Sequence, residues 1–290
     1  MTTLRIARHA KVPGPDAQIL FPPAELGRCV AFAIVRDTRA RTLSRTDRLN
    51  YFPASPLTTL TVVMNGQIHM ANALCDLQTL SLSEPVPREF VSLPQPGPIV
   101  SWSPGAVRVV TIGFFPDAWC KLGGALDGNC LPQAIKAAAE TFRRSRDAVV
   151  GWENFCGLLQ EVWRAAHTDE IVPYWSGSSL LADWVRHVLL QSAMSGPGRS
   201  VRAIERRLKR STGHSRQALE FFAKVEQLHG LANGARSETA AQIAHDAVFC
   251  DQAHMGRAVK RATGFSPVRL NKLIETEEAF WCYRLLGERF

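Results

Sequence analysis

Two short basic segments carry the same side chains at the same spacing. Residues 206–216 read RRLKRSTGHSR and residues 257–267 read RAVKRATGFSP, so an arginine, a Lys-Arg pair, a Thr-Gly pair and a serine recur 51 positions apart. Guanidinium and ammonium groups bind phosphate, and the guanidinium fork also fits the major-groove edge of guanine. The chemistry that these residue types support is therefore the binding of a polyanion.

Positive charge gathers around the first of these segments. The chain of 290 residues has a formal net charge of +8, and residues 199–216 hold seven basic side chains against one acidic one, Glu205. Such a stretch favours a nucleic-acid partner, although the solvated face of an ordinary helix can also be basic. Charge alone leaves both interpretations open.

Helical spacing gives the first segment two faces. Arg202, Arg206 and Lys209 lie four and three positions apart and share an outer face, while Ile204 and Leu208 fall on the opposite, apolar face. This pattern predicts a helix that packs on one side and presents cations on the other.

The second segment repeats this arrangement. Ala253, Arg257 and Lys260 occupy its outer face, and Met255 and Val259 its inner one. Three further residues follow in each copy. The first is a glycine that can end the helix in the left-handed conformation, the second is a serine that can cap the next helix, and the third is a leucine inside that next helix. These pairs are Gly213 and Gly264, Ser215 and Ser266, and Leu219 and Leu270.

A further short helix precedes the second basic segment. SETAAQIAHDA (237–247) predicts a helix capped by Ser237, and a turn through residues 248–250 leads into the basic helix from Asp251. A short helix, a tight turn and a longer polar helix together are typical of a helix-turn-helix.

The residues 243–267, IAHDAVFCDQAHMGRAVKRATGFSP, resemble the signature of AraC/XylS-type transcriptional regulators, roughly I-A-x-x-x-G-F-x-D-x-S-H-F-x-R-x-F-K-x-x-x-G-x-S-P. The matching positions are Ile243, Ala244, Phe249, Asp251, His254, Arg257, Lys260, Gly264, Ser266 and Pro267. The resemblance implies two helix-turn-helix units joined by a long helix, for which residues 215–230 are suited. It also implies sequence-specific binding to double-stranded DNA, transcription regulation and contact with RNA polymerase.

Two departures from this pattern stand out. Val248 occupies the turn position where the family usually has glycine, and a β-branched residue is costly at positive φ. The segment 181–198, LADWVRHVLLQSAMSGPG, is helical but runs into Gly-Pro-Gly, so the first unit lacks a clean counterpart of residues 237–247.

The resemblance assigns base contacts to outward positions near the start of each basic helix. These are Arg202, Glu205 and Arg206 in the first unit and Gln252, Ala253, Gly256 and Arg257 in the second. Phosphate contacts are expected from Lys209, Arg210, Lys260 and Arg261. The alternatives are that Arg206 or Arg257 forms a buried salt bridge, and that Glu205 only pairs with Arg202 or Lys209.

The fold expected for the whole chain is α+β. Residues 1–167 read as a β-rich, cupin-like barrel with following helices from 132 to 167, residues 168–179 as a linker, and residues 180–290 as an all-α double helix-turn-helix. β-branched residues in 56–70 run into Asn65-Gly66, a favourable hairpin turn, and residues 97–115 read as two strands around a Pro-Gly turn.

The front region is expected to bind a small-molecule effector or to mediate a homodimer, as the resemblance implies. Six aromatic residues could line a pocket or fill a core: Tyr51, Phe52, Trp102, Phe114, Phe115 and Trp119. Only His9 and His69 lie in this region where metal-binding cupins need more ligands, so we expect no metal, no cofactor and no enzyme. The alternatives are an architectural or co-regulatory protein whose front domain binds only protein, and a cupin-like enzyme with a DNA-binding tail.

The cysteines and the hydropathy pattern indicate in which cellular compartment the protein is expected. Seven scattered cysteines without a CxxC pair favour buried thiols in a reducing cytosol. No apolar run approaches the roughly 18 residues of a membrane helix, and the first residues have no apolar signal core. We therefore expect a cytoplasmic, nucleoid-associated protein without a membrane partner; the operator, the effector and activation versus repression stay open.

Overall fold

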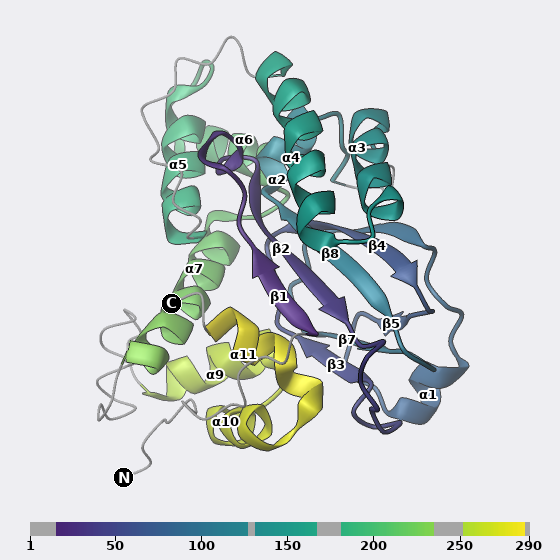
Figure 1. Ribbon diagram of the computed structural model, residues 1–290. Helices are drawn as coiled ribbons and strands as arrows, with labels where there is room; N and C mark the ends of the chain where they lie inside the picture. Colours follow the sequence, from purple (N-terminus) through teal and green to yellow (C-terminus); the bar gives the residue numbers. More distant parts are fainter. Residues whose placement is uncertain (1–15, 127–130, 167–180, 235–251, 288–290) are drawn as a thin grey trace.

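A computed structural model gives the structure of residues 16–126, 131–166, 181–234 and 252–287 (Figure 1). Two antiparallel sheets and a layer of helices form the first part of the chain, and the described residues after 180 are helical outside short connections. No helix in the described ranges is both long and apolar enough to cross a membrane.

The larger sheet has five strands and the smaller one three. In spatial order the larger sheet contains β1 (Ala17–Leu20), β2 (Val30–Asp37), β8 (Arg108–Phe114), β4 (Thr58–Asn65) and β6 (Glu89–Ser92). The smaller sheet contains β3 (Leu49–Phe52), β7 (Ile99–Trp102) and β5 (His69–Ala71). A short 3-10 helix η1 (Ala24–Leu26) precedes β2, and helix α1 (Leu77–Leu82) follows β5.

The two sheets do not close into a barrel within the described residues, so the closed barrel expected for this region is wrong. A C-terminal helix, α11 (Trp281–Gly287), packs at the β1–β2 end of the larger sheet. Its Trp281 and Leu285 join Ala17 and Ile34 in one buried cluster. The apolar surface at this end is therefore covered by a helix from the end of the chain.

The turn at Asn65-Gly66 exists, but it does not make a hairpin. Gly66 has φ 83°, and a Cβ there would lie 2.5 Å from the carbonyl oxygen of Ala106. The flanking strands enter different sheets, because β4 pairs with β6 and β8 whereas β5 pairs with β7. Strand β4 is buried on both faces, and such a strand is stabilised by neighbours on either side rather than by a local partner.

Helices α2 (Pro116–Lys121), α3 (Gln133–Arg144) and α4 (Ala148–Ala165) follow β8 and cover one face of the larger sheet (Figure 1). The apolar segment 132–167 forms two helices because Asp147 caps α4, accepting hydrogen bonds from the backbone of Val149 and Val150. Phe155 and Leu159 face the core as their spacing predicts, whereas Leu158 is exposed.

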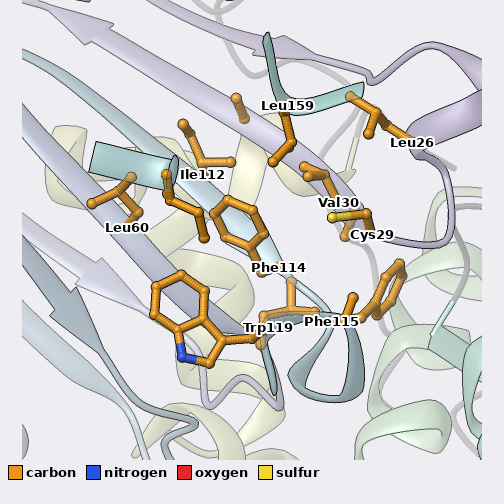
Figure 2. Close-up of a cluster of buried hydrophobic side chains, with 14 of the residues drawn as sticks. Leu26, Cys29, Val30, Leu60, Ile112, Phe114, Phe115, Trp119 and Leu159 are labelled. Carbon is orange, nitrogen blue, oxygen red and sulfur yellow. The ribbon is translucent and has the colours of Figure 1, made fainter. Parts of the chain in front are cut away.

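The main core lies between this sheet and these helices (Figure 2). Phe114, Phe115 and Trp119 are fully buried there, so these three of the six aromatic candidates fill a core rather than a pocket.

The C-terminal part is all helical between its short loops. Its elements are α5 (Leu181–Met194), α6 (Val201–Thr212), α7 (Arg216–Gly234), α9 (Gln252–Thr263), α10 (Pro267–Thr276), the 3-10 helix η2 (Glu278–Phe280) and α11. Helix α7 is the long connecting helix expected at 215–230, and it extends four residues further. The proposed linker at 168–179 lies outside the described residues.

The C-terminal helices share the core of the front part. Trp184 of α5 stacks on Phe115 at 5.2 Å between ring centroids, and its indole Nε1 donates to Oδ1 of buried Asp117 at 2.8 Å. Leu208 of α6 and Leu219 of α7 are fully buried in the same cluster. The boundary placed near residue 180 therefore does not separate two independent cores.

The cysteines follow the expected pattern in part. Cys29, Cys156 and Cys282 are buried, Cys75 and Cys120 are half-buried, and all five are free thiols. Burial raises the pKa of Cys156 and of Cys282 to about 12, so both thiols stay protonated and unreactive. Cys130 and Cys250 lie outside the described residues.

Candidate nucleic-acid interface and ligand cavity

The sequence repeat is also a structural repeat. Helix α6 ends at Gly213 with φ 75°, and helix α9 ends at Gly264 with φ 82°. The amide of each glycine donates back into its helix, to the carbonyl of Lys209 at 2.9 Å and of Lys260 at 2.8 Å. Both helices thus end in the same left-handed cap that the Thr-Gly pairs predict.

The recurring threonines hold the two turns together. The hydroxyl of Thr212 donates to the carbonyl of Leu208 at 2.7 Å and accepts from the amide of His214 at 3.2 Å. Thr263 makes the same pair of bonds with Val259 and the amide of Phe265, at 2.8 and 3.2 Å. Sequence reasoning assigned the helix stop to glycine alone and missed this role of the threonine, although the Thr-Gly pair itself recurs.

The predicted DNA-contacting side chains of α6 lie on its exposed face. Exposed are Arg202, Glu205, Arg206, Lys209 and Arg210, whereas Leu208 and Thr212 on the other side are fully buried. In α9 the exposed side chains are those of Ala253, Arg257, Lys260 and Arg261. Gly256 is half-buried, and Gln252 begins the helix with a side chain that lies outside the described residues.

The alternative of a buried salt bridge is wrong for Arg206 and Arg257, because both side chains are exposed. Glu205 is exposed, and no ion pair with Arg202 or Lys209 is present among the described residues. The pKa of Arg216 is raised by its hydrogen bond to Glu220, with a smaller contribution from Glu205. Arg261, one of the predicted phosphate contacts, also makes a cation–π contact. Its guanidinium lies 4.6 Å from the ring centre of Phe221 on α7.

The first helix-turn-helix is more regular than its sequence suggests. Helix α5 supplies the expected first helix, and the turn after it contains Gly196 and Gly198 at positive φ, 78° and 86°. Ser200 then caps α6, accepting from the amide of Ala203 at 3.3 Å. The Gly-Pro-Gly stretch is thus the turn of the unit rather than a break in it.

Arg207 ties this turn to α6 and was missed by the sequence analysis. Its guanidinium donates to the carbonyls of Ser192, Pro197 and Gly198 at 2.7, 3.1 and 3.0 Å. These carbonyls belong to the end of α5 and the following turn, where no helical amide reaches them. Arg207 lies outside the outer face of α6 that Arg202 and Arg206 define. This position in the sequence pattern could have indicated that Arg207 has a structural role.

The second helix-turn-helix is described only in its second helix. The predicted first helix, residues 237–247, and the turn with Val248 lie outside the described residues. Helix α9 contacts α7 and α10, and α7 also contacts α6, so the connecting helix touches both basic helices.

One loop of the front part contacts both repeats. The loop between β3 and β4 donates from the amide of Ala54 to the carbonyl of Ala262 in α9, at 2.7 Å. Pro56 of the same loop lies beside His214 in the turn after α6, and its backbone raises the pKa of that imidazole against the larger lowering by burial. The loop therefore contacts both basic units.

A cavity of about 240 Å³ lies between the two sheets and extends to the C-terminal helices. From the front part it is lined mainly by apolar side chains of both sheets, with Phe52 and Trp102 among them, so two of the six aromatic candidates do line a pocket. From the C-terminal part it is lined by Leu181, Phe222, Val225, Glu226, Trp281, Cys282 and Leu286. Tyr51 instead stacks on Phe280 at 4.8 Å between ring centroids.

Charged groups in the cavity wall connect it to both ends of the C-terminal part. Arg36 of β2 pairs with Asp16 at 2.9 Å and with Glu278 of η2 at 2.7 Å. Glu226 of α7 accepts from the first amides of α5, that of Leu181 at 2.6 Å among them. A molecule in this cavity would touch the groups that hold the start of α5 and the segment before α11.

Arg48 is a second cation in the cavity wall. Its guanidinium donates to the carbonyls of Ser44 and Pro104, and neither of these oxygens neutralises its charge. The described residues do not bring together three or more side chains of the kinds that hold metal ions.

Comparisons with known proteins give structural likeness at low identity. A crystal structure of ToxT from Vibrio cholerae O395 is 14% identical with a TM-score of 0.37, and the alignment covers 79% of this chain and 95% of that one. Wild-type ToxT from Vibrio cholerae strain SCE256 with a bound unsaturated fatty acid is 12% identical with a TM-score of 0.34 and the same coverage. No protein-family model matches the sequence, and no curated protein does either.

The two left-handed caps give a prediction for stability. Gly213→Ala and Gly264→Ala should each lower the free energy of unfolding by about 1 kcal/mol or more, because alanine is strained at these φ values. At Gly264 the added Cβ would also meet Leu74 Cδ1 at 2.3 Å, but this partly exposed side chain can move aside, so the two losses should be similar. Gly157→Ala, with open space around a helical glycine of α4, should be neutral or stabilising. Urea unfolding of the three variants measures this, and equal losses in all three would contradict it.

His214 gives a prediction for pH dependence. Burial lowers the pKa of His214, and its hydrogen bond to Pro56 offsets this only in part. The unfolded chain takes up the proton near pH 6.5, whereas the folded protein does so only at lower pH. The free energy of unfolding should therefore fall as the pH drops below about 6.5.

The control is His214→Gln, which keeps a donor for Pro56 but does not titrate. Its unfolding free energy, measured by urea titration between about pH 7.5 and 5, should depend less on pH than that of the wild type. An unchanged pH profile would show that His214 does not carry the effect.

Proposed function

We propose that this protein is a sequence-specific, DNA-binding transcriptional regulator. The observation that carries the proposal is the duplicated unit of a basic-faced helix, a left-handed glycine cap and a second helix. The basic faces of α6 and α9 are exposed and their apolar faces are packed, as helices that enter a groove require.

In this function the cations divide into two roles. Lys209, Arg210, Lys260 and Arg261 would bind phosphates and supply most of the affinity. Arg202, Glu205, Arg206 and, in α9, Gln252, Ala253, Gly256 and Arg257 would contact base edges, with the arginines suited to guanine. The unit boundaries proposed are residues 1–167, 168–179 and 180–290, and contact with RNA polymerase and a homodimer belong to the same proposal.

The cavity is the proposed effector site. Its lining is mainly apolar, it is larger than the 150 Å³ or so that accommodates benzene, and Arg48 offers a charge that backbone carbonyls do not neutralise. These features suit a small molecule with an apolar body and one acidic group, the chemistry of the unsaturated fatty acid named for one ToxT structure. A ligand there would act by shifting the population between two arrangements of α6 and α9.

The cavity between the sheets favours an effector-binding front part over one that binds only protein. An architectural or co-regulatory protein of that kind has no use for a cavity whose wall includes both sheets and α7. We propose a cytoplasmic regulator that is not an enzyme.

Selection of bound fragments from random double-stranded DNA tests the central proposal. A regulator should enrich one motif with two half-sites about one helical turn, roughly 34 Å, apart. Recovery of unenriched DNA, bound with the same affinity as random sequence, would refute it.

The selected operator then separates the two kinds of contact. Arg257→Ala should weaken binding to the operator by roughly 1–3 kcal/mol and relax selection at one base pair. Lys260→Ala should weaken operator and random DNA alike and reduce the slope of log affinity against log salt by about 1. Affinity measured from about 50 to 200 mM salt decides this; an equal loss on random DNA for Arg257→Ala would reassign Arg257 to phosphate.

Filling the cavity tests the effector site. Met70 lines the cavity, and Met70→Trp adds volume there, so it should weaken binding of a monounsaturated fatty acid at least about tenfold. Leu82→Trp, at a residue that is 79% exposed, is the matched control and should leave binding unchanged. Calorimetric titration measures both, and equal affinities of the two variants would place the ligand elsewhere.

A further inference from the structure

An apolar side chain stands exposed at the start of the basic helix of the first repeat. Val201 is the first residue of α6, directly after the cap Ser200, and it is 71% exposed. Its neighbours along the chain include Arg199 and Arg202, both exposed. Its methyl groups are therefore accessible to a partner that the flanking cations would attract.

The repeat register gives Val201 a counterpart in the second unit. The spacing of 51 that relates Arg206 to Arg257 also relates Val201 to Gln252, the first residue of α9. Gln252 is one of the residues expected to contact bases. Val201, its equivalent in the first unit, is not among the residues for which the resemblance implies a base contact. Helices α6 and α9 have the same length and the same C-terminal glycine cap, so Val201 and Gln252 hold the same position in the two helices.

We propose that Val201 contacts the C5-methyl group of a thymine and thereby specifies that base in the first half-site. This inference rests on the proposed function and adds a specificity-determining residue to it. Thymine is distinguished in the major groove by its methyl group, which is read by apolar contact rather than by hydrogen bonds. Valine offers two methyl groups and no donor or acceptor. Val201 lies directly before Arg202 and one helical turn before Glu205, two residues expected to contact bases, at the end of α6 that would enter the groove.

A protein partner is the competing explanation for this exposed valine. Leu190 and Met194 of α5 are also exposed, at 52% and 70%, and precede α6 in the same unit. The position of Val201 favours DNA, because it belongs to the basic helix rather than to α5 and because cations flank it on both sides.

Replacing single thymines by deoxyuridine tests the contact, since deoxyuridine pairs identically but lacks the methyl group. Each thymine of the first half-site of the selected operator is replaced in turn, and dissociation constants are measured for the full-length protein. The wild type should lose about fourfold in affinity at one thymine, the effect of one buried methyl group. Val201→Ala should bind the unmodified operator about fourfold more weakly and show no further loss at that position.

Val268→Ala is the matched control, because Val268 is 60% exposed near the start of α10, outside the basic helices. This variant should keep the wild-type sensitivity to the missing methyl group. Equal sensitivity of wild type and Val201→Ala at every thymine would overturn the inference. So would full operator affinity of Val201→Ala combined with reduced transcription in a purified system, which would assign Val201 to a protein partner.

These outcomes are separable from a failure of the proposed function. If no motif is enriched from random DNA, the regulator proposal itself fails before any thymine is replaced. If an operator is found and depends on Arg257 while methyl sensitivity does not depend on Val201, only the present inference is lost.

Discussion

The short loop between β3 and β4 contacts both repeated units at once. Its Ala54 amide donates to the carbonyl of Ala262 in α9 at 2.7 Å, and its Pro56 lies beside His214 in the turn after α6. A hydrogen bond of this kind contributes little energy, about 1 kcal/mol. The importance of these contacts is geometric, because they hold the ends of two repeated units against one segment of backbone.

The loop between β3 and β4 also forms part of the cavity wall. Residues 52–57 line the cavity and carry contacts to both repeats, so the same few residues face the cavity on one side and the basic helices on the other. Glu226, which holds the start of α5, lies in the same wall. Interfaces of this kind shift between discrete packings rather than deforming continuously, so occupancy of the cavity is well placed to bias how α6 and α9 are presented.

The local features of the repeat could be predicted from sequence, and the long-range features could not. The outer cations, the glycine caps and the matching leucines follow from helical spacing and capping rules, which involve only neighbours in the chain. The pairing at Asn65-Gly66 was wrong because strands β4 and β5 find partners more than twenty residues away, which no turn motif encodes. The open pair of sheets and the cavity arise from α11 and α7, far from the strands in sequence.

The buried bond between Trp184 and Asp117 has a consequence for the evolutionary modularity of the chain. A domain that can be exchanged between proteins needs a hydrophobic core of its own. Here the indole of Trp184, in the first C-terminal helix, packs next to Phe115 of the front part. Cutting the chain near residue 180 would leave that indole, with Leu208 and Leu219, facing water on an orphaned helical fragment. Each part therefore constrains which substitutions the other accepts at this contact.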